Sequence, residues 1–354
     1  MRLIFFLFPL FFSALQNAHQ DKWIVITTIQ YPTEAVKKLA QLKDWHLVVV
    51  GDKKTPADWH LENCEYLSPQ DQEKLNYKII QYLPWNHYCR KNIGYLYAIE
   101  HGAKIIYDTD DDNYMNFDSI YYLPVNTQTA CYKTDATTVN PYEYFGHPTV
   151  WPRGFPLSHI TQQTSYELIT KQCFIPVQQG VVNNDPDVDA IFRLTHFVEI
   201  NFDATKKAVS LPKNVICPYN TQNTIIHYAA FWGLAVPIST AFRVCDIWRG
   251  YWVQRLLWDI GASLCFMPPT ATQYRNEHNL IKDFEDEIDL YTKAENLVNT
   301  LLAWHSNAPT LRERIQDLIA QLTNQQFFKE KEIVFMNAWL EDLESIGFVF
   351  PEIF

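Results

Sequence analysis

The stretch Lys104–Asn113, KIIYDTDDDN, decides the fold because it joins a buried strand to a cluster of acids. The apolar run Ile105–Tyr107 is typical of a buried strand, and four aspartates follow it within five residues. Such a cluster repels itself unless a cation offsets its charge. Mg²⁺, Mn²⁺ and Ca²⁺ prefer oxygen ligands, and Mg²⁺ usually combines one or two carboxylates with substrate phosphates. An Asp-x-Asp at the carboxyl end of a strand therefore indicates a metal-bridged diphosphate.

Two other interpretations of this acidic stretch can be weighed. A calcium-binding EF-hand loop that begins at Asp108 needs Gly at its sixth position and Glu at its twelfth. Those positions hold Asn113 and Ser119, so the EF-hand is excluded. A solvated turn at a strand end is the simpler alternative for an isolated Asp-x-Asp, so the choice depends on the rest of the chain.

The whole chain has the composition of an acidic globular protein. Its 354 residues are 47% hydrophobic, which is enough to bury a large core. The 40 acidic and 29 basic residues give a net charge of -11, which argues against a nucleic acid or an anionic membrane as a partner. A polyanionic substrate would need a locally basic pocket.

Residues 1–18 have the layout of a signal peptide or a short signal anchor. Arg2 precedes the apolar run Leu3–Phe12, and small residues follow it. A run of this length is short for a membrane span. It predicts an exported or secretory-pathway protein, with the Golgi lumen as its address if the source is eukaryotic. The seven cysteines form no Cys-x-x-Cys pair, so no zinc or redox motif is indicated.

Strand and helix patterns alternate along the first third of the chain. Strands are predicted at Trp23–Ile29 and His46–Val50, and helices at Thr33–Leu42, from Ser68 onward, and at Cys89–His101. The alternation predicts an α/β fold with a mostly parallel sheet flanked by helices. Ligands of such sheets bind beyond the carboxyl ends of the strands.

The predicted strand ends carry groups suited to a ligand. The first two strands end in Thr27, Thr28 and Asp52. The helix before the acidic strand begins with Arg90, Lys91 and Asn92. Two cations and an amide near a helix N-terminus would favour a diphosphate, although a solvated helix face is the alternative for both cations.

The second half of the chain is less regular. Residues 114–160 are rich in Pro, Asn, Tyr and Gly, which predicts a binding loop. Residues 178–194 hold a second acidic run, which predicts a turn and a helix cap in preference to a second metal site. Residues 244–258 form a predicted helix with Asp246 near its start, and Gly261–Pro268 a predicted strand. The remainder is predicted to be helical, at 284–304, 310–322 and 329–343.

Several long segments resemble the STELLO family of glycosyltransferase-like proteins. They are NPYEYFG, WPRGFPL, QQGVVNNDPDVDAIFRLT, NTQNT, RVCDIWRGYWVQRLLW and QYRNEH. The similarity runs from about Trp23 to Trp304. It implies a GT-A fold over residues 19–280, followed by a C-terminal helical region at 281–354. The family also resembles, more distantly, reversibly glycosylated polypeptides that act as UDP-sugar mutases and share the DDDN segment.

The resemblance also implies roles for single residues. It implies Mn²⁺ or Mg²⁺ at Asp110 and Asp112, with His278 completing the metal shell, and a nucleotide-sugar donor, a UDP-sugar being favoured. The residues expected to contact the donor are Thr27, Thr28, Asp52, Arg90, Lys91, Asn92, Asp110 and Asp111. Asp246 is the candidate general base, with a helix cap as the alternative, and the acceptor is expected near Trp151, Arg153 and Arg249.

Three functions are compatible with these residues. The first is a metal-dependent glycosyltransferase acting on a glycan, protein or small-molecule acceptor. The second is a sugar-nucleotide mutase or autoglycosylating protein, which would form product from the donor alone. The third is a non-catalytic scaffold, which the intact acidic motif argues against because closely packed carboxylates cost stability without a cation.

Overall fold

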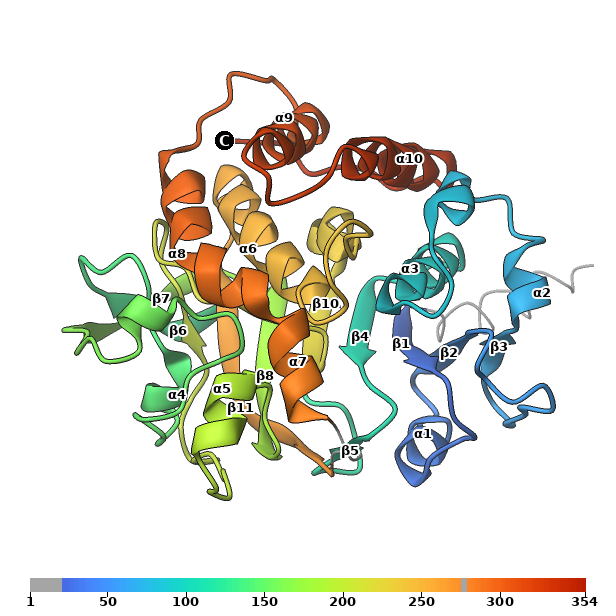
Figure 1. Cartoon of the computed structure of the whole chain (residues 1–354), viewed down its shortest axis with the longest axis horizontal. Helices are drawn as coiled ribbons and strands as arrows, with labels where there is room; N and C mark the ends of the chain where they lie inside the picture. The colour runs from blue at the N-terminus through green and yellow to red at the C-terminus, as the bar shows by residue number, and fades with distance from the viewer. Residues whose placement is uncertain (1–20, 275–278) are drawn as a thin grey trace, which may run out of the picture.

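In the residues that the structure describes, 21–274 and 279–354 of a computed structural model, one mixed sheet of eleven strands runs through the molecule (Figure 1). The strand order is β3-β2-β1-β4-β10-β8-β11-β9-β6-β7, and β5 pairs with β11. The strands are β1 (Lys22–Thr28), β2 (His46–Gly51), β3 (Glu65–Leu67), β4 (Ile105–Thr109), β5 (Asn113–Met115), β6 (Asn126–Lys133), β7 (Glu167–Phe174), β8 (Val177–Asn184), β9 (Val209–Ser210), β10 (Asn223–His227) and β11 (Leu264–Gln273).

Helices flank this sheet, which confirms the predicted α/β class. The α-helices are α1 (Glu34–Leu39), α2 (Pro69–Gln72), α3 (Lys91–Glu100), α4 (Pro141–Tyr144), α5 (Ala190–Thr195), α6 (Cys245–Leu257), α7 (Leu280–Asp286), α8 (Ile288–Ala303), α9 (Leu311–Asn324) and α10 (Lys331–Ser345). Short 3₁₀ helices include η2 (Lys78–Tyr82), η3 (Tyr88–Arg90) and η5 (Tyr228–Leu234). In Figure 1, α3 lies beside β1 and β4, and α6 to α8 lie over the part of the sheet that contains β8 and β11.

Strand β1 is buried on both faces, which explains its unbroken apolar sequence. Successive side chains of a strand point to opposite faces. Trp23 and Val25 belong to the larger core cluster, whereas Ile24 and Ile26 belong to a second cluster that also contains Val36 of α1. Thr33 caps α1 by accepting a hydrogen bond from the Val36 amide, as the hydroxyl before that helix predicted.

The strand order changes direction at β1, and this reversal determines where the candidate site lies. β2 and β4 both pair with β1, and both pairings are parallel. The chain runs outward from β1 through β2 to β3, and then returns through α3 to β4 on the other side of β1. A crevice beyond the carboxyl ends of the strands is expected at such a reversal. The acidic stretch follows β4 at this crevice.

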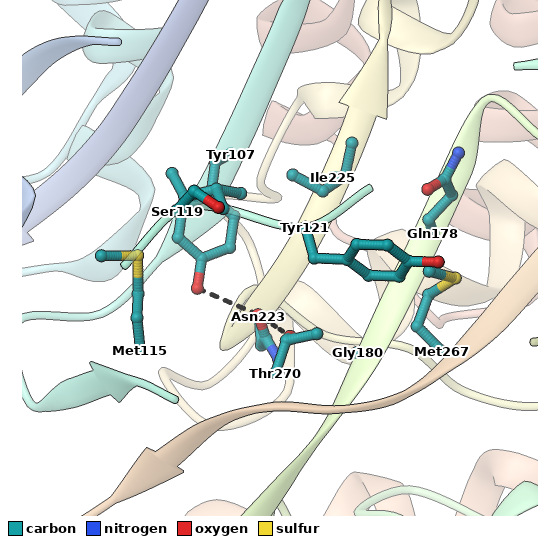
Figure 2. Close-up of a pocket in the computed structure, with 11 residues that line it drawn as sticks. Tyr107, Met115, Ser119, Tyr121, Gln178, Gly180, Asn223, Ile225, Met267 and Thr270 are labelled. Carbon is teal, nitrogen blue, oxygen red and sulfur yellow. Dashed lines mark hydrogen bonds between the residues drawn. The ribbon is translucent and has the colours of Figure 1, made fainter. Parts of the chain in front are cut away.

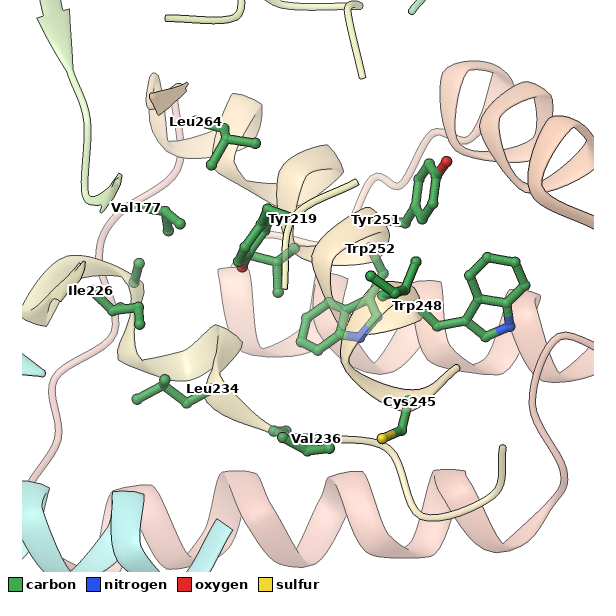
Figure 3. Packing of buried hydrophobic residues seen from close by; sticks show 14 of the residues in the cluster. Val177, Tyr219, Ile226, Leu234, Val236, Cys245, Trp248, Tyr251, Trp252 and Leu264 are labelled. Carbon is green, nitrogen blue, oxygen red and sulfur yellow. The ribbon is translucent and has the colours of Figure 1, made fainter. Parts of the chain in front are cut away.

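Helix α6 is buried along its whole length of 13 residues. Figure 3 shows Trp248, Tyr251 and Trp252 packed with side chains of neighbouring strands and loops, including Tyr219. Trp248 and Trp252 are 1% and 0% exposed, so both tryptophans are core residues. Burial all round makes unpaired polar groups costly, and Asp246, Arg249, Gln254 and Arg255 of α6 each make side-chain hydrogen bonds.

The C-terminal helices share the core of the sheet region. Trp339 of α10 is 0% exposed and donates from Nε1 to the carbonyl of Trp232 in η5. The backbone amides of Lys78 and Ile79 in η2 donate to Asp342 of α10. These contacts pack α10 onto the rest of the molecule.

Three details of the predicted secondary structure were wrong. Residues 114–160 are no single loop, because they contain β5, β6 and α4, and the Tyr142, Phe145 and Trp151 side chains are buried in the core. β6 was missed because its sequence, NTQTACYK, has few apolar residues. The helix from Ser68 is a single turn, α2, and the helix expected at 284–304 is interrupted at Glu287 between α7 and α8.

None of the helices in the described part of the chain is long and apolar enough to cross a membrane. The predicted leader, residues 1–18, lies outside the described residues.

Candidate active site

A cleft of about 690 Å³ opens at the reversal of strand order. Its walls come from the ends of β1, β2 and β4, from the loop before η3, and from the start of α6 and α7. A volume of this size suits a small-molecule ligand. The cleft is lined by many of the residues that were predicted from the sequence: Thr27, Thr28, Asp52, Arg90, Asp110, Asp111, Asp112, Arg153 and Asp246.

A chain of hydrogen bonds links the acidic stretch to Asp246. Tyr88 Oη lies 2.7 Å from Asp110 Oδ1 and 2.6 Å from Thr221 Oγ1. Thr221 Oγ1 lies 3.4 Å from Asp246 Oδ2. Burial raises the pKa of Tyr88 well above its usual value, so this side chain stays a neutral hydroxyl. The candidate metal ligand and the candidate base therefore face the same cleft and share two hydroxyl groups.

The chain of hydrogen bonds between Asp110 and Asp246 lacks one hydrogen. The contacts Asp110–Tyr88, Tyr88–Thr221 and Thr221–Asp246 each need one hydrogen. The hydroxyl groups of Tyr88 and Thr221 supply one hydrogen each, so two hydrogens serve three contacts. The third contact is satisfied only if a carboxyl group carries a proton or a cation replaces it. Burial raises the pKa of Asp110 to about 6, against the opposing effect of Lys91. A cation beside Asp110 would favour the ionised form of this carboxylate, which burial disfavours.

The other two aspartates of the motif are held in place by neighbouring strands. Thr28 Oγ1 donates to Asp111 Oδ2 at 2.6 Å, and the Thr33 hydroxyl donates to the Asp111 carbonyl. Gln273 Nε2, at the end of β11, lies 2.9 and 3.0 Å from the two carboxylate oxygens of Asp112. These contacts fix the loop after β4 at the mouth of the cleft.

The residues of this site fit a hard divalent cation that also binds a substrate. Asp110 and Asp112 present carboxylates to the cleft, and one or two carboxylates plus substrate phosphates are the usual ligands of Mg²⁺. Among residues 21–274 and 279–354, no group of three or more His, Cys, Asp or Glu side chains is arranged to hold a metal by itself. His278, the predicted third ligand, lies outside the described residues.

The structure does not bring Lys91, Asn92 or Arg249 into the cleft. Lys91 Nζ lies 2.7 Å from Asp108 Oδ1, and Arg249 Nη2 lies 3.2 Å from Asp108 Oδ2. The side chains of Lys91, Arg249 and Asp108 are only 0–1% exposed. Asn92 bonds to the amide and the carbonyl of Val236. We predicted these residues for substrate contacts because the sequence alone does not show that Asp108 lies in the core and requires counterions.

The polar groups of Arg90 and Trp151 also form hydrogen bonds with other residues of the protein. Arg90 borders the cleft, but its guanidinium donates to Gln72 Oε1 and to the Leu83 carbonyl, and it stacks 3.5 Å from the centre of the Trp85 ring. Trp151 is buried and donates from Nε1 to Asp189. Asp189 caps α5, as the second acidic run predicted.

Arg153 lies between two carboxylates in the cleft. Its Nε is 2.7 Å from Asp187 Oδ1, and its Nη2 is 2.9 Å from Asp246 Oδ2. Burial alone would raise the pKa of Asp187, but Arg153 lowers it below the usual value. Asp246 lies in the first turn of α6 but makes no capping hydrogen bond, so the alternative of a helix cap is wrong.

Asp52 orders the loop that carries Tyr88. Its carboxylate accepts hydrogen bonds from the backbone amides of Asn86 and His87, at 2.9 and 3.3 Å. Phe242, which is 50% exposed, packs edge-on against the rings of His87 and Tyr88 on the opposite wall. The carboxyl end of β2 thus sets the position of the aromatic wall of the cleft.

Sequence reasoning missed several residues that line the cleft. They are Lys54, Asn86, Tyr88, Asp187, Thr221, Gln222, Phe242, Arg243, Gln273 and Lys282. A signal for some of them was present, because Asp187, Thr221, Arg243 and Gln273 belong to the segments on which the resemblance rests. No local pattern indicates that these segments converge.

A second cavity, of about 10 Å³, has room for about one water molecule. Figure 2 shows that Tyr107 of β4, Asn223 of β10 and Tyr121 line it, and Tyr107 Oη donates to Asn223 Oδ1 at 2.9 Å. Its size excludes a sugar or a nucleotide.

Comparison with known proteins supports the resemblance. A model of the STELLO glycosyltransferases matches residues 243–354. The Arabidopsis thaliana proteins named "Probable glycosyltransferase STELLO1" and "Probable glycosyltransferase STELLO2" are 36% and 38% identical to this chain over 363 residues. Each alignment covers 96% of this chain and 46% or 47% of the relative. The chain therefore spans about half the length of these relatives.

Proposed function

Because this chain is similar over 96% of its length to two proteins named as probable STELLO glycosyltransferases, we propose that it transfers a sugar from a nucleotide-sugar donor to an acceptor hydroxyl in a cation-dependent reaction. The observation that carries the proposal is the pair of carboxylates, Asp110 and Asp246, that share one cleft through Tyr88 and Thr221. One carboxylate suits a cation and the other suits an acceptor. A UDP-sugar is the donor that the sequence resemblance favours.

In this mechanism, Asp110 and Asp112 would hold Mn²⁺ or Mg²⁺. The cation would neutralise the charge that develops on the leaving diphosphate. Asp52 and Thr28 lie at the ends of β2 and β1, where the base and ribose of the donor would fit the crevice. Each of these groups acts by binding and orienting the donor.

Asp246 takes the proton of the acceptor hydroxyl. General-base catalysis requires a carboxylate within hydrogen-bond reach of that hydroxyl. Arg153 fixes the orientation of Asp246 through their contact of 2.9 Å. Thr221 approaches the same Asp246 oxygen and ties its position to Tyr88.

A thermal-shift screen tests the donor site. The wild-type protein would be heated with UDP-, GDP- and CDP-sugars, with and without Mn²⁺, beside the double variant Asp110→Ala/Asp112→Ala. A rise in Tm that needs both Mn²⁺ and one nucleotide, and that the variant loses, is the expected result. The proposal fails if no nucleotide shifts the Tm of the wild type. Product formed from the donor alone would instead favour a mutase or an autoglycosylating protein.

The cellular address is part of the same proposal. The leader-like residues 1–18 predict export or entry into the secretory pathway, where sugar transfer to glycans and proteins takes place. Detection of the full chain inside sealed vesicles, protected from added protease, would support this address, and digestion without detergent would argue against it.

A further inference from the structure

The cleft contains more acidic than basic side chains. This raises the question of which cationic side chain binds the donor diphosphate. Among the residues that the structure describes, eight aspartates line the cleft: Asp52, Asp110, Asp111, Asp112, Asp187, Asp246, Asp283 and Asp286. The cations along the described walls are Lys54, Arg90, Arg153, Arg243 and Lys282. A metal at Asp110 offsets part of this charge, but a diphosphate also requires donors that can reach its oxygens.

Most of these cations are already committed or lie at the rim. Arg90 is bonded to Gln72 and Leu83, and Arg153 is held by Asp187 and Asp246. Lys282 is exposed and pairs with Asp286 at 3.5 Å. Lys54 is also exposed, in the loop after β2.

Arg243 differs from the other cations because part of its guanidinium has no partner. Its Nε donates to Glu287 Oε1 at 2.5 Å and lies 3.8 Å from Asp283 Oδ1, but its Nη2 is buried and has no hydrogen-bond partner within residues 21–274 and 279–354. The side chain is 11% exposed and lines the cleft. A buried guanidinium nitrogen without a partner is unfavourable, so it favours an anionic ligand beside it.

The rest of Arg243 is held rigidly. Glu287, its partner, is 0% exposed and also accepts hydrogen bonds from the Ala190 amide and the Tyr291 hydroxyl. The Arg243 carbonyl accepts a hydrogen bond from Arg153. These contacts fix the guanidinium before a ligand arrives, so little conformational entropy is lost on binding.

Arg243 also stands at the amino end of α6, beside the candidate base. Val244 is the N-cap of this 13-residue helix and supplies no side-chain hydrogen bond. The partial positive charge of a helix N-terminus favours an anion at the same place. Because Asp246 follows three residues later, an anion bound here would lie next to the sugar that is transferred.

We infer that Arg243 binds the donor phosphate nearest to the sugar, which is the β-phosphate of a nucleoside diphosphate. This inference rests on the proposed function. It replaces Lys91 and Arg90, which the sequence predicted for this role. It also predicts that the diphosphate binds only as its metal complex, because acids outnumber bases along the described walls of the cleft.

Isothermal titration calorimetry tests the assignment on the full chain. The probes are UDP, GDP and CDP and their monophosphates, each with Mn²⁺. Arg243→Lys can still pair with Glu287 but lacks Nη2, so it separates ligand binding from folding. Lys133→Gln changes a cationic side chain of β6, where Lys133 pairs with Glu167 of β7, and serves as the control outside the cleft.

For the diphosphate that the wild type binds, Arg243→Lys should raise the Kd by at least about tenfold. The Kd of the matching monophosphate should change by less than about twofold, as should both values in Lys133→Gln. Equal Kd values for the diphosphate in wild type and Arg243→Lys would overturn the inference while leaving the proposed function intact. Equal losses for diphosphate and monophosphate would overturn the β-phosphate assignment. Absence of nucleotide binding by the wild type would overturn both proposals.

Discussion

At the scale of single residues, Asp108 and its neighbours show how one stretch serves two purposes. Asp108 belongs to β4 and is 0% exposed, with Lys91 and Arg249 as its counterions. Asp110, two residues later, reaches the cleft and is 30% exposed. Four acids that look equivalent in the sequence thus divide into one structural carboxylate and three at the site.

The buried ion group predicts a stability effect at Lys91. Lys91→Met leaves Asp108 with Arg249 as its remaining counterion, so the free energy of unfolding should fall by about 3–5 kcal/mol. Urea denaturation followed by circular dichroism measures this. Lys37→Met, on the exposed face of α1, is the matched control and should change stability little. A loss at Lys91 no larger than at Lys37 would contradict the assignment.

The proposed role of Asp246 as general base predicts an effect on turnover. Asp246→Asn keeps a side chain that can bond to Arg153 but removes the base, so turnover should fall by about 10²- to 10⁴-fold. The shift in Tm caused by the donor should persist, since the donor site uses other residues. Turnover close to that of the wild type would remove Asp246 from the role of base.

At the scale of elements, α6 organises the site by packing very closely against its surroundings. A Cβ atom added at Gly250 would lie 2.2 Å from the carbonyl oxygen of Tyr219. The residues after Tyr219 include Thr221, so the contact at Gly250 sets the distance between α6 and the loop that bonds to Tyr88 and Asp246. The sequence marks Gly250 only as an unfavourable residue inside a helix.

Gly250→Ala therefore has two opposing effects on the free energy of unfolding. Alanine favours a helix over glycine by about 1 kcal/mol. Forcing α6 away from Tyr219 costs more, so we expect the variant to lose about 1–3 kcal/mol of stability. Thermal denaturation measures the change, and Thr292→Ala, at an exposed position of α8, is the control. A variant as stable as the wild type would show that α6 can move away from this loop.

At the scale of the whole molecule, the C-terminal helices support the wall of the cleft. Glu332 of α10 is 0% exposed and accepts hydrogen bonds from the backbone amides of Ile238 and Ser239. These two residues precede Phe242 and Arg243 on the same segment. The C-terminal region thus positions residues that sequence reasoning assigned to another domain.

Glu332 also predicts a dependence of stability on pH. Burial raises its pKa to about 7, against hydrogen bonds that lower it. The folded protein therefore holds this proton more tightly than the unfolded chain, whose Glu titrates near 4.3. Its contribution is complete below about pH 4.3 and is lost as the pH rises through about 7, by at most about 4 kcal/mol.

The matched variant isolates this effect. Glu332→Gln keeps the acceptor oxygen but cannot ionise, so the difference in stability between variant and wild type should change in favour of the variant from pH 5 to pH 8. Urea denaturation across that range is the measurement. A difference that is constant with pH would show that Glu332 does not titrate there.

The sequence by itself determined the elements and the motif. Apolar runs and caps are local signals, so β1, β2, β4, α1, α3 and α6 were predicted near their observed positions, and the acidic stretch was recognised at the end of its strand. The similarity of long segments indicated the family. The polar strand β6 was missed because a strand with few apolar residues has little local signal.

Only the tertiary structure decided which charged residues line the cleft. A lysine or arginine near a motif has the same local pattern whether it faces the cleft or a buried carboxylate. Asp108 is buried and requires counterions, and it pairs with Lys91 and Arg249. Arg153 pairs with two acids from separate segments, Asp187 and Asp246. These partners lie far apart in the sequence, so the distribution of charge in the cleft depends on the folded arrangement of the chain.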